Sequence, residues 1–184
     1  MKTKDIVLIA LFAALTAALG LFPLFMVPVL AVPVTAQSMG PMLAGSVLGA
    51  RRGALALLLF LLLVAVGLPL LSGGRGGYGI LIGPGAGFLW CWPVAAWLIG
   101  WLFERFWTRL NYATAGLIIA LGGIVVVYAG GVAWLGLVIG KPFAPSLLAM
   151  GAFVPGDLLK VVVATLVAMT VRRSYPLIVA PAAR

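Results

Sequence analysis

Residues 113–139 read ATAGLIIALGGIVVVYAGGVAWLGLVI and contain no charged side chain. A run of about 18 or more apolar residues is the signature of a helix that crosses a lipid bilayer. Four further stretches, 6–22, 53–71, 86–103 and 161–171, are almost as free of charge. Of the 184 residues, 65% are hydrophobic and 8% are charged, whereas soluble domains carry about 25% charged residues. The sequence therefore predicts an all-α integral membrane protein.

The apolar runs predict a bundle of six membrane helices that forms one membrane domain, residues 1–184. The expected helices are 4–22, 35–50, 53–71, 86–108, 113–139 and 155–172. The first begins with MKTKD and has the charged start and apolar body of a signal peptide. Its apolar stretch is long, and no small-residue cleavage site followed by a soluble domain appears. We therefore interpret it as the first membrane helix.

Lysine and arginine residues are placed at the ends of the apolar runs, which is an orientation signal. With an even number of helices and the N-terminus inside, nine of the twelve basic residues fall on the inner side. These nine are Lys2, Lys4, Arg51, Arg52, Arg105, Arg109, Arg172, Arg173 and Arg184. The outer loops hold only Arg75 and Lys141. The bias predicts a multi-pass protein of a bacterial cell membrane with both termini in the cytoplasm.

Composition argues against several classes of protein. The net charge of +9 suggests nucleic acid, but no basic stripe with interleaved aromatic residues is present. There is no histidine, one cysteine (Cys91), and only three acids. We therefore expect no metal site, no cofactor and no catalytic set, so an enzyme is not expected. A channel would require rings of pore-lining polar residues, and none is seen.

Two predicted outer connections are unusual. The first, LFPLFMVPVLAVPVTAQ (21–37), is apolar and carries a proline every five residues, a spacing that no regular helix tolerates. It is either an awkward interfacial loop or, as we favour, an apolar lid over an outward-facing pocket. The second, GLPLLSGGRGGYGILIGPGAGFL (67–89), is rich in glycine, which permits close backbone approach to a ligand or helix. It lacks the Gly-Lys-Ser/Thr ending of a Walker A loop.

The segment FVPGDLLK (153–160) carries the most informative charges. Asp157 is expected in the first turn of the last helix, where a carboxylate complements the helix dipole. Lys160 lies one turn deeper, where a cation is costly, and shares a helix face with Asp157. The two residues either simply pair or, as we favour, form a polar ligand site. In such a site Asp157 accepts hydrogen bonds from ligand N–H groups and Lys160 meets a carbonyl or carboxylate.

Further candidate residues fall on the same outer side. Gln37 and Arg75 are polar candidates, although Arg75 is equally well explained as a solvated loop charge. Tyr78 and Trp134 offer ring surface to an apolar ligand, or else belong to the interfacial aromatic belt. On the first helix, a small-residue face that includes Ala10 and Ala14 permits close helix approach. That face serves either packing within the chain or a partner subunit.

Three segments together resemble one known family. PVTAQSMGPMLAGSVLGARRG (33–53), GLPLLSGGRGGYGILIGPGAGFL (67–89) and FVPGDLLK (153–160) are similar to the biotin-specific S component of energy-coupling factor (ECF) transporters, the BioY family. The resemblance covers roughly residues 5–173. It implies six helices, an outward-facing biotin pocket closed by a lid in the first connection, and docking of helix one onto a transmembrane coupling subunit driven by two ATPases.

The resemblance also assigns residues. Asp157 and Lys160 match the family's acidic and basic positions, and Gln37 matches its glutamine after the proline-rich segment. Arg75 occupies a variable polar position. Gly83-Pro84-Gly85-Ala86-Gly87-Phe88 replaces the usual Gly-Pro-Thr/Ser-Gly-Gly-Tyr, so this chain lacks a hydroxyl there. Ala10 and Ala14 fit the small-residue motif.

The implied function is high-affinity biotin binding for vitamin uptake. The alternatives are a solitary biotin facilitator and an S component for another small vitamin.

Overall fold

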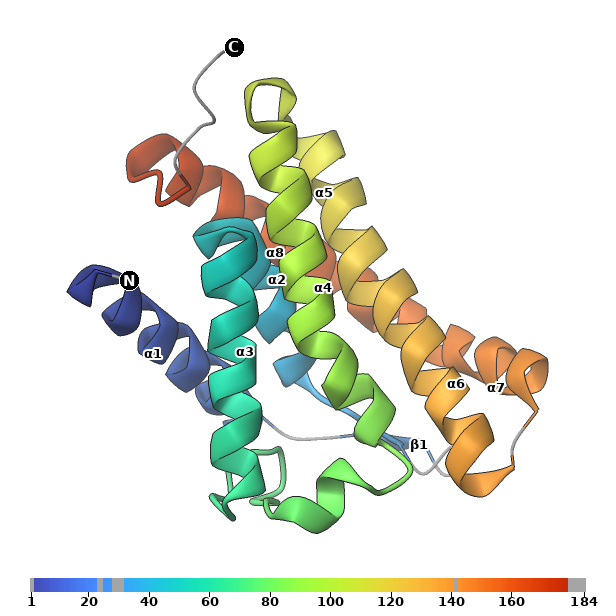
Figure 1. Ribbon diagram of the computed structural model, residues 1–184. Coiled ribbons are helices and arrows are strands. Elements are labelled where there is room, and N and C mark those ends of the chain that lie inside the picture. Colours follow the sequence, from blue (N-terminus) through green and yellow to red (C-terminus); the bar gives the residue numbers. More distant parts are fainter. Residues whose placement is uncertain (1, 23–24, 28–31, 141, 179–184) are drawn as a thin grey trace.

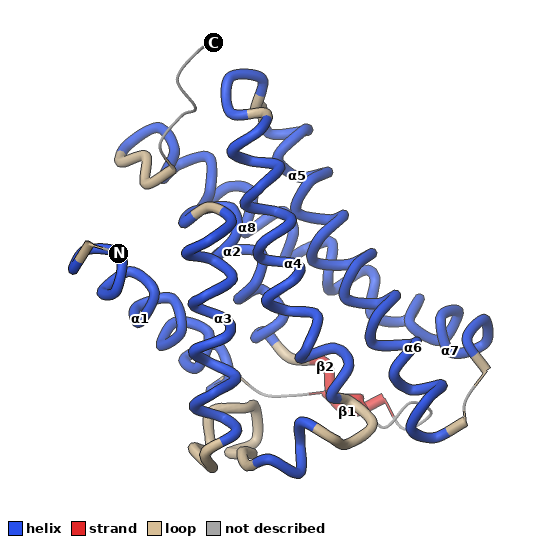
Figure 2. Tube along the Cα trace, viewed as in Figure 1, coloured by secondary structure: helices blue, strands red, loops and turns tan. Residues whose placement is uncertain are grey.

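The structure is a helical bundle with one small hairpin of strands (Figures 1 and 2). This computed structural model describes residues 2–22, 25–27, 32–140 and 142–178. Its α-helices are α1 (Thr3–Ala18), α2 (Met39–Leu48), α3 (Ala50–Ala65), α4 (Ala86–Arg105), α5 (Tyr112–Ala120), α6 (Val127–Ile139), α7 (Phe143–Ala149) and α8 (Val154–Ser174). The strands are β1 (Phe25–Val27) and β2 (Val32–Val34).

Four helical stretches in the described part of the chain are long and apolar enough to cross a membrane. They are Thr3–Leu21, Ala86–Arg105, Tyr112–Ile139 and Phe143–Ser174. The remaining large helices, α2 and α3, have 10 and 16 residues. At 1.5 Å per residue, α2 reaches only about 15 Å, half of a bilayer core.

Helix α2 lies at the centre of the bundle, where every residue from Gly40 to Leu48 is buried. It contacts α3, α4 and α8, while α1 packs on α3 and α6 packs on α4. Its sequence, MGPMLAGSVL, is apolar with small residues. Such a helix is suited to contacts on all sides, because it has no polar face to turn toward solvent and lets neighbours approach closely.

Close approach at the centre depends on glycine. A Cβ atom at Gly100 of α4 would collide with backbone atoms of Gly49 and Ala50, and a Cβ at Gly53 would lie 2.8 Å from the Ala44 carbonyl oxygen. Backbone atoms cannot rotate away as a side chain does, so these contacts require a residue without a Cβ atom, which is glycine.

We expect Gly100→Ala to lower the free energy of unfolding by about 2 kcal/mol, because the added methyl group forces α4 away from the α2–α3 turn. Gly156→Ala in α8 is the matched control, since nothing lies within 4 Å of its Cβ position and alanine favours the helix. Thermal unfolding in detergent measures both. Equal unfolding temperatures for the two variants would contradict this description of the packing.

Several predicted helix boundaries were wrong. The second helix begins at Met39 rather than 35, because Thr35 is extended and Ala36–Ser38 form a 3₁₀ turn. The break before the third helix is at Gly49, whose φ of 85° favours glycine, and not at Arg51–Gly53.

The third helix ends at Ala65 rather than 71. Gly67 follows with a φ of 102°, and the residue before Pro69 is disfavoured in a helix. The fourth ends at Arg105 rather than 108, and a 3₁₀ turn, Trp107–Arg109, follows it.

The last two predicted helices also differ in detail. The stretch predicted as 113–139 is helical from Tyr112 to Ile139, but Leu121–Val126 within it is a π-helix. Helix α7 was not predicted, and with the 3₁₀ turn Met150–Phe153 it leads directly into α8. A π segment often marks a functional region, because its extra residue widens the helix locally.

The first connection contains the hairpin. β1 and β2 pair antiparallel, with Phe25 opposite Val34 and Val27 opposite Val32. The extended backbone at 25–27 and 32–34 agrees with the proline spacing, which predicts no regular helix there. The predicted lid over 21–37 falls largely on residues 23–34, whose side chains lie outside the described part of the structure.

The two ends of the bundle differ in chemistry. The C-terminus of α4 and the N-termini of α3 and α5 lie at one end, and the hairpin, the 66–85 connection and the end of α6 lie at the other (Figure 1). Lys2, Arg51 and Arg52 line one hollow near the first of these ends. We call the first the basic end and the second the hairpin end.

Candidate ligand-binding site

A buried network of charged and polar groups connects α8, α6 and the base of the hairpin. The Lys160 ammonium donates to Asp157 Oδ1 at 2.8 Å, to the Thr35 carbonyl oxygen at 2.9 Å and to Ser38 Oγ at 2.9 Å. The Tyr128 hydroxyl donates to Asp157 Oδ2. The Lys160 and Asp157 side chains are 16% and 8% exposed, so water screens their attraction little.

Local sequence explains how the pair is formed. Pro155 lies in the first turn of α8, where proline fits because its missing N–H would have no helical partner. Asp157 and Lys160 then lie three residues apart on one face of the helix. The two side chains do form the ion pair that the sequence analysis gave as the alternative to a ligand site. Every buried side-chain nitrogen or oxygen among the described residues has a hydrogen-bond partner, those of this network included.

The network faces a small cavity that adjoins a larger one. The small cavity, about 80 Å³, is lined by Asp157, Lys160 and Tyr128 together with the apolar rings of Phe88 and Trp92. The larger cavity, about 300 Å³, lies beside it and shares the walls Thr35, Phe88 and Trp92. Together they form a mostly apolar chamber with polar groups at defined positions, which is the usual composition of a small-molecule site.

Gln37 lines the larger cavity, but its amide is fully hydrogen-bonded within the protein. Nε2 donates to the Thr16 and Leu70 carbonyl oxygens at 3.0 and 2.8 Å. Oε1 accepts from Ser72 N at 2.9 Å and from Ser72 Oγ at 3.2 Å. An amide has two donors and two acceptor positions, so none is left for a ligand. The side chain instead ties α1, the start of α2 and the loop after α3 together.

Arg75 lines the larger cavity from an exposed turn. Leu71 and Arg75 exchange two backbone hydrogen bonds, and Gly73 and Gly74 turn the chain between them with φ values of 80° and 67°. Arg75 Nε donates to the Ser72 carbonyl oxygen at 3.0 Å, so its other guanidinium donors remain available.

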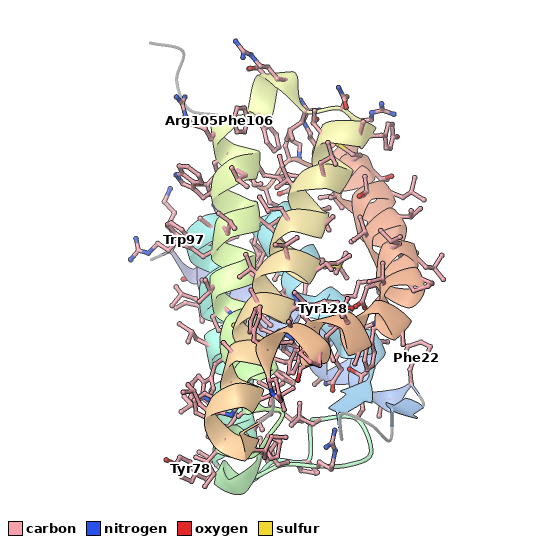
Figure 3. All side chains as sticks on the ribbon, turned by 90° about the vertical axis from the view of Figure 1, so that its right-hand side faces the viewer. Phe22, Tyr78, Trp97, Arg105, Phe106 and Tyr128 are labelled. Atoms are coloured by element: carbon pink, nitrogen blue, oxygen red, sulfur yellow. The ribbon has the colours of Figure 1, made fainter. Side chains whose placement is uncertain are left out.

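The structure does not bring Tyr78 and Trp134 into the chamber. Tyr78 is 65% exposed at the hairpin end, far from Tyr128 (Figure 3). Trp134 donates from Nε1 to the Gly83 carbonyl oxygen at 2.9 Å, and its Cβ lies against Gly87. Trp134 therefore holds the Gly-Pro-Gly segment in place, and that segment, as Gly83–Gly85, forms part of the cavity wall. Neither ring lines the two cavities, because each side chain points elsewhere.

Comparison with known proteins identifies the family. A profile described as the BioY family matches residues 1–177. The chain belongs to the BioY family. It is 49% identical to the biotin transporter BioY of Rhizobium etli, over 99% of this chain and 100% of that protein. It is 48% identical to the biotin transporter BioY of Rhodobacter capsulatus, over 94% of this chain and 95% of that protein.

A solved structure agrees. The S component for biotin from an ECF-type ABC transporter superposes with a TM-score of 0.91 at 30% identity, covering 96% of this chain and 97% of the other. The resemblance to the BioY family that the three sequence segments indicated is thus confirmed, and the mainly helical architecture agrees with it.

Sequence reasoning missed several site residues of this BioY-family chain. Tyr128 lies inside the longest apolar run, and its hydroxyl is a polar group placed at membrane depth, which is a usable signal. Thr35 and Ser38 flank the predicted glutamine, but nothing in the sequence brings them to Lys160. Phe88 and Trp92 lie four residues apart, one helical turn, on α4.

The small-residue face of helix one is divided in the BioY-family structure. Ala10 and Ala14 are exposed, whereas Ala13 is 2% exposed and packs in the core. Ile6, Val7 and Leu11 are exposed beside them, and an exposed apolar surface of this kind meets either lipid or another protein. No group of three or more metal-ligating side chains occurs among the described residues.

Proposed function

We propose that the chain is the biotin-binding membrane subunit of an ECF-type vitamin transporter, and not an enzyme. The observation that carries the proposal is the Asp157–Lys160–Tyr128 network, which lines the small apolar cavity beside the larger one. The names of the relatives and of the matched structure, all concerned with biotin, support the same ligand.

Biotin suits the chemistry of this chamber. Its ureido ring has two N–H donors and one carbonyl acceptor, its thioether ring is apolar, and its tail ends in a carboxylate. Within the protein Lys160 donates to Thr35 and Ser38, and Asp157 accepts from Tyr128. We infer that a ligand exchanges with some of these internal bonds, Asp157 accepting from N–H groups and Lys160 donating to a carbonyl or carboxylate. Arg75 is a second cationic contact at the mouth.

The finer topology is part of the proposal. We propose six membrane helices in a single membrane domain: the four long stretches together with the shorter helices α2 and α3. We further propose that the basic end faces the cytoplasm of a bacterial cell, so that both termini are inside and the chamber opens outward. Reaction of single introduced cysteines at Tyr78 and at Arg105 with an impermeant thiol reagent in whole cells, with Cys91 replaced by serine, tests this orientation.

Transport then requires partners, since the chain has no nucleotide-binding motif. We propose that the exposed Ala10 and Ala14 face contacts the transmembrane coupling subunit, which two ATPases drive. Because the alanine side chain has no heavy atom beyond Cβ, another helix can approach closely at these positions.

The test of function is titration of the detergent-purified protein with biotin, followed by uptake measurements. We expect biotin to bind saturably with a one-to-one stoichiometry. We expect no binding of apolar carboxylic acids of similar size that lack the ureido ring. Uptake in cells with and without the coupling subunit and ATPases separates the subunit from a solitary facilitator. Binding of another small vitamin in preference to biotin would overturn the assignment of the ligand.

A further inference from the structure

A second hollow lies at the basic end, away from the ligand chamber. It measures about 420 Å³ and is lined by Lys2, Asp5, Ile9, Leu48, Arg51, Arg52, Leu55, Glu104 and Ile178. Its walls therefore combine charged groups from the helix ends with apolar side chains from the bodies of α1 and α3. The lining residues come from Lys2 and α1, from α2, α3 and α4, and from Ile178 after α8.

The acids of this hollow are already in use. Glu104 Oε1 accepts from Ala50 N at 2.8 Å, at the first residue of α3. Asp5 accepts from Lys2 N at 2.9 Å and lies 3.4 Å from Arg52 Nε. Arg51 is exposed, and among the described residues it has no ion pair and no side-chain hydrogen bond. The hollow thus has three cations against two carboxylates, a net charge of +1, and among the described residues Arg51 is a cation without an ion pair.

The position of these arginines is not explained by membrane orientation alone. Arg51 and Arg52 lie in the first turn of α3, where the helix dipole disfavours a cation. The orientation signal would be equally strong with the arginines in a loop. An anion held by Arg51 at the N-terminus of α3 would offset both the unpaired charge of Arg51 and its unfavourable interaction with the helix dipole.

We propose that the basic hollow binds the phosphate headgroup of an anionic phospholipid. The phosphate lies against Arg51 with Lys2 and Arg52 nearby, and the first carbons of the acyl chains lie along Ile9 and Leu55. Free phosphate has the same charged group, but it does not use the apolar wall, so the acyl contacts distinguish the two sources. The site is distinct from the biotin chamber and does not depend on the function proposed for it.

Native mass spectrometry of the full-length protein with added phosphatidylglycerol tests the proposal. Loss of one juxtamembrane cation predicts that Arg51→Gln binds phosphatidylglycerol about fivefold more weakly than the unmodified chain. Arg105→Gln is the matched control, because Arg105 is exposed at the same end (Figure 3) and does not line the hollow. Thermal unfolding of both variants reports whether they remain folded.

Three arms decide the outcome. We expect phosphatidylcholine to bind the two variants and the unmodified chain equally weakly, and millimolar inorganic phosphate to leave bound phosphatidylglycerol in place. Equal binding of phosphatidylglycerol by Arg51→Gln and Arg105→Gln would overturn the proposal. So would displacement by inorganic phosphate alone. Loss of coupling-subunit binding in Arg51→Gln, with lipid binding unchanged, would assign the hollow to an acidic protein partner instead.

Discussion

Lys160→Met is expected to weaken biotin binding by about 100-fold or more while leaving the cavity volume nearly unchanged. The variant removes the ammonium that donates to Asp157, Thr35 and Ser38, and the charge-assisted bond it would give to biotin. Truncating one member of a buried, hydrogen-bonded charge pair costs about 2–5 kcal/mol, because the remaining carboxylate stays in a poorly solvated site. Isothermal titration calorimetry with purified protein measures the change.

The charge pair allows a sharper design than a single variant. Lys160→Met alone leaves Asp157 as an unpaired buried carboxylate and lowers stability as well as affinity. The double variant Lys160→Met with Asp157→Asn leaves no lone charge, so we expect its unfolding temperature to be close to that of the unmodified chain. We still expect no tight binding of biotin. Lys4→Met at the basic end is the charge-removal control. Full biotin affinity in the double variant would refute the ligand role of the pair.

Gln37→Leu is expected to reduce the free energy of unfolding by about 3 kcal/mol, and to affect stability more than biotin affinity. Leucine is similar in size but leaves the Thr16 and Leu70 carbonyl oxygens and Ser72 N without the partner they have now. Each buried polar group left unpaired costs about 1–3 kcal/mol. Thermal unfolding in detergent, scored beside Thr165→Val, measures the effect. Thr165 is a comparably buried polar residue whose side chain, among the described residues, bonds only to the Val161 carbonyl oxygen of its own helix.

The same variant separates two roles for Gln37. If the amide only holds α1 against the loop after α3, biotin affinity of the folded fraction falls far less than in Lys160→Met. If the amide contacts the ligand, as the family resemblance implied, binding is lost with little change in unfolding temperature. The second pattern would show that the hydrogen bonds seen here exchange when biotin enters.

Site residues were predictable where their signal is local. Asp157 and Lys160 are three residues apart on one helix, so spacing alone places them on the same face. Tyr128 reaches Asp157 across 29 residues, and Lys160 reaches Thr35 across 125. Such contacts depend on how whole helices pack, which periodicity does not encode. For the same reason the sequence leaves open whether Trp134 lies in the pocket or in the aromatic belt, whereas in the structure its Nε1 donates to the Gly83 carbonyl oxygen and its ring lines neither cavity.

The amino-acid sequence by itself determined that the chain is a helical membrane protein of the BioY type, with a charge pair on its last helix. It did so because hydropathy, charge placement and short motifs are properties of neighbouring residues. Only the tertiary structure decided that the chain breaks at Gly49, that Gln37 is already fully hydrogen-bonded, and that Asp157 and Lys160 line a small cavity beside a larger one. Those outcomes depend on how segments that are distant in the sequence pack against each other. At the closest contacts, whether a residue is glycine or carries a methyl group decides whether two helices can touch.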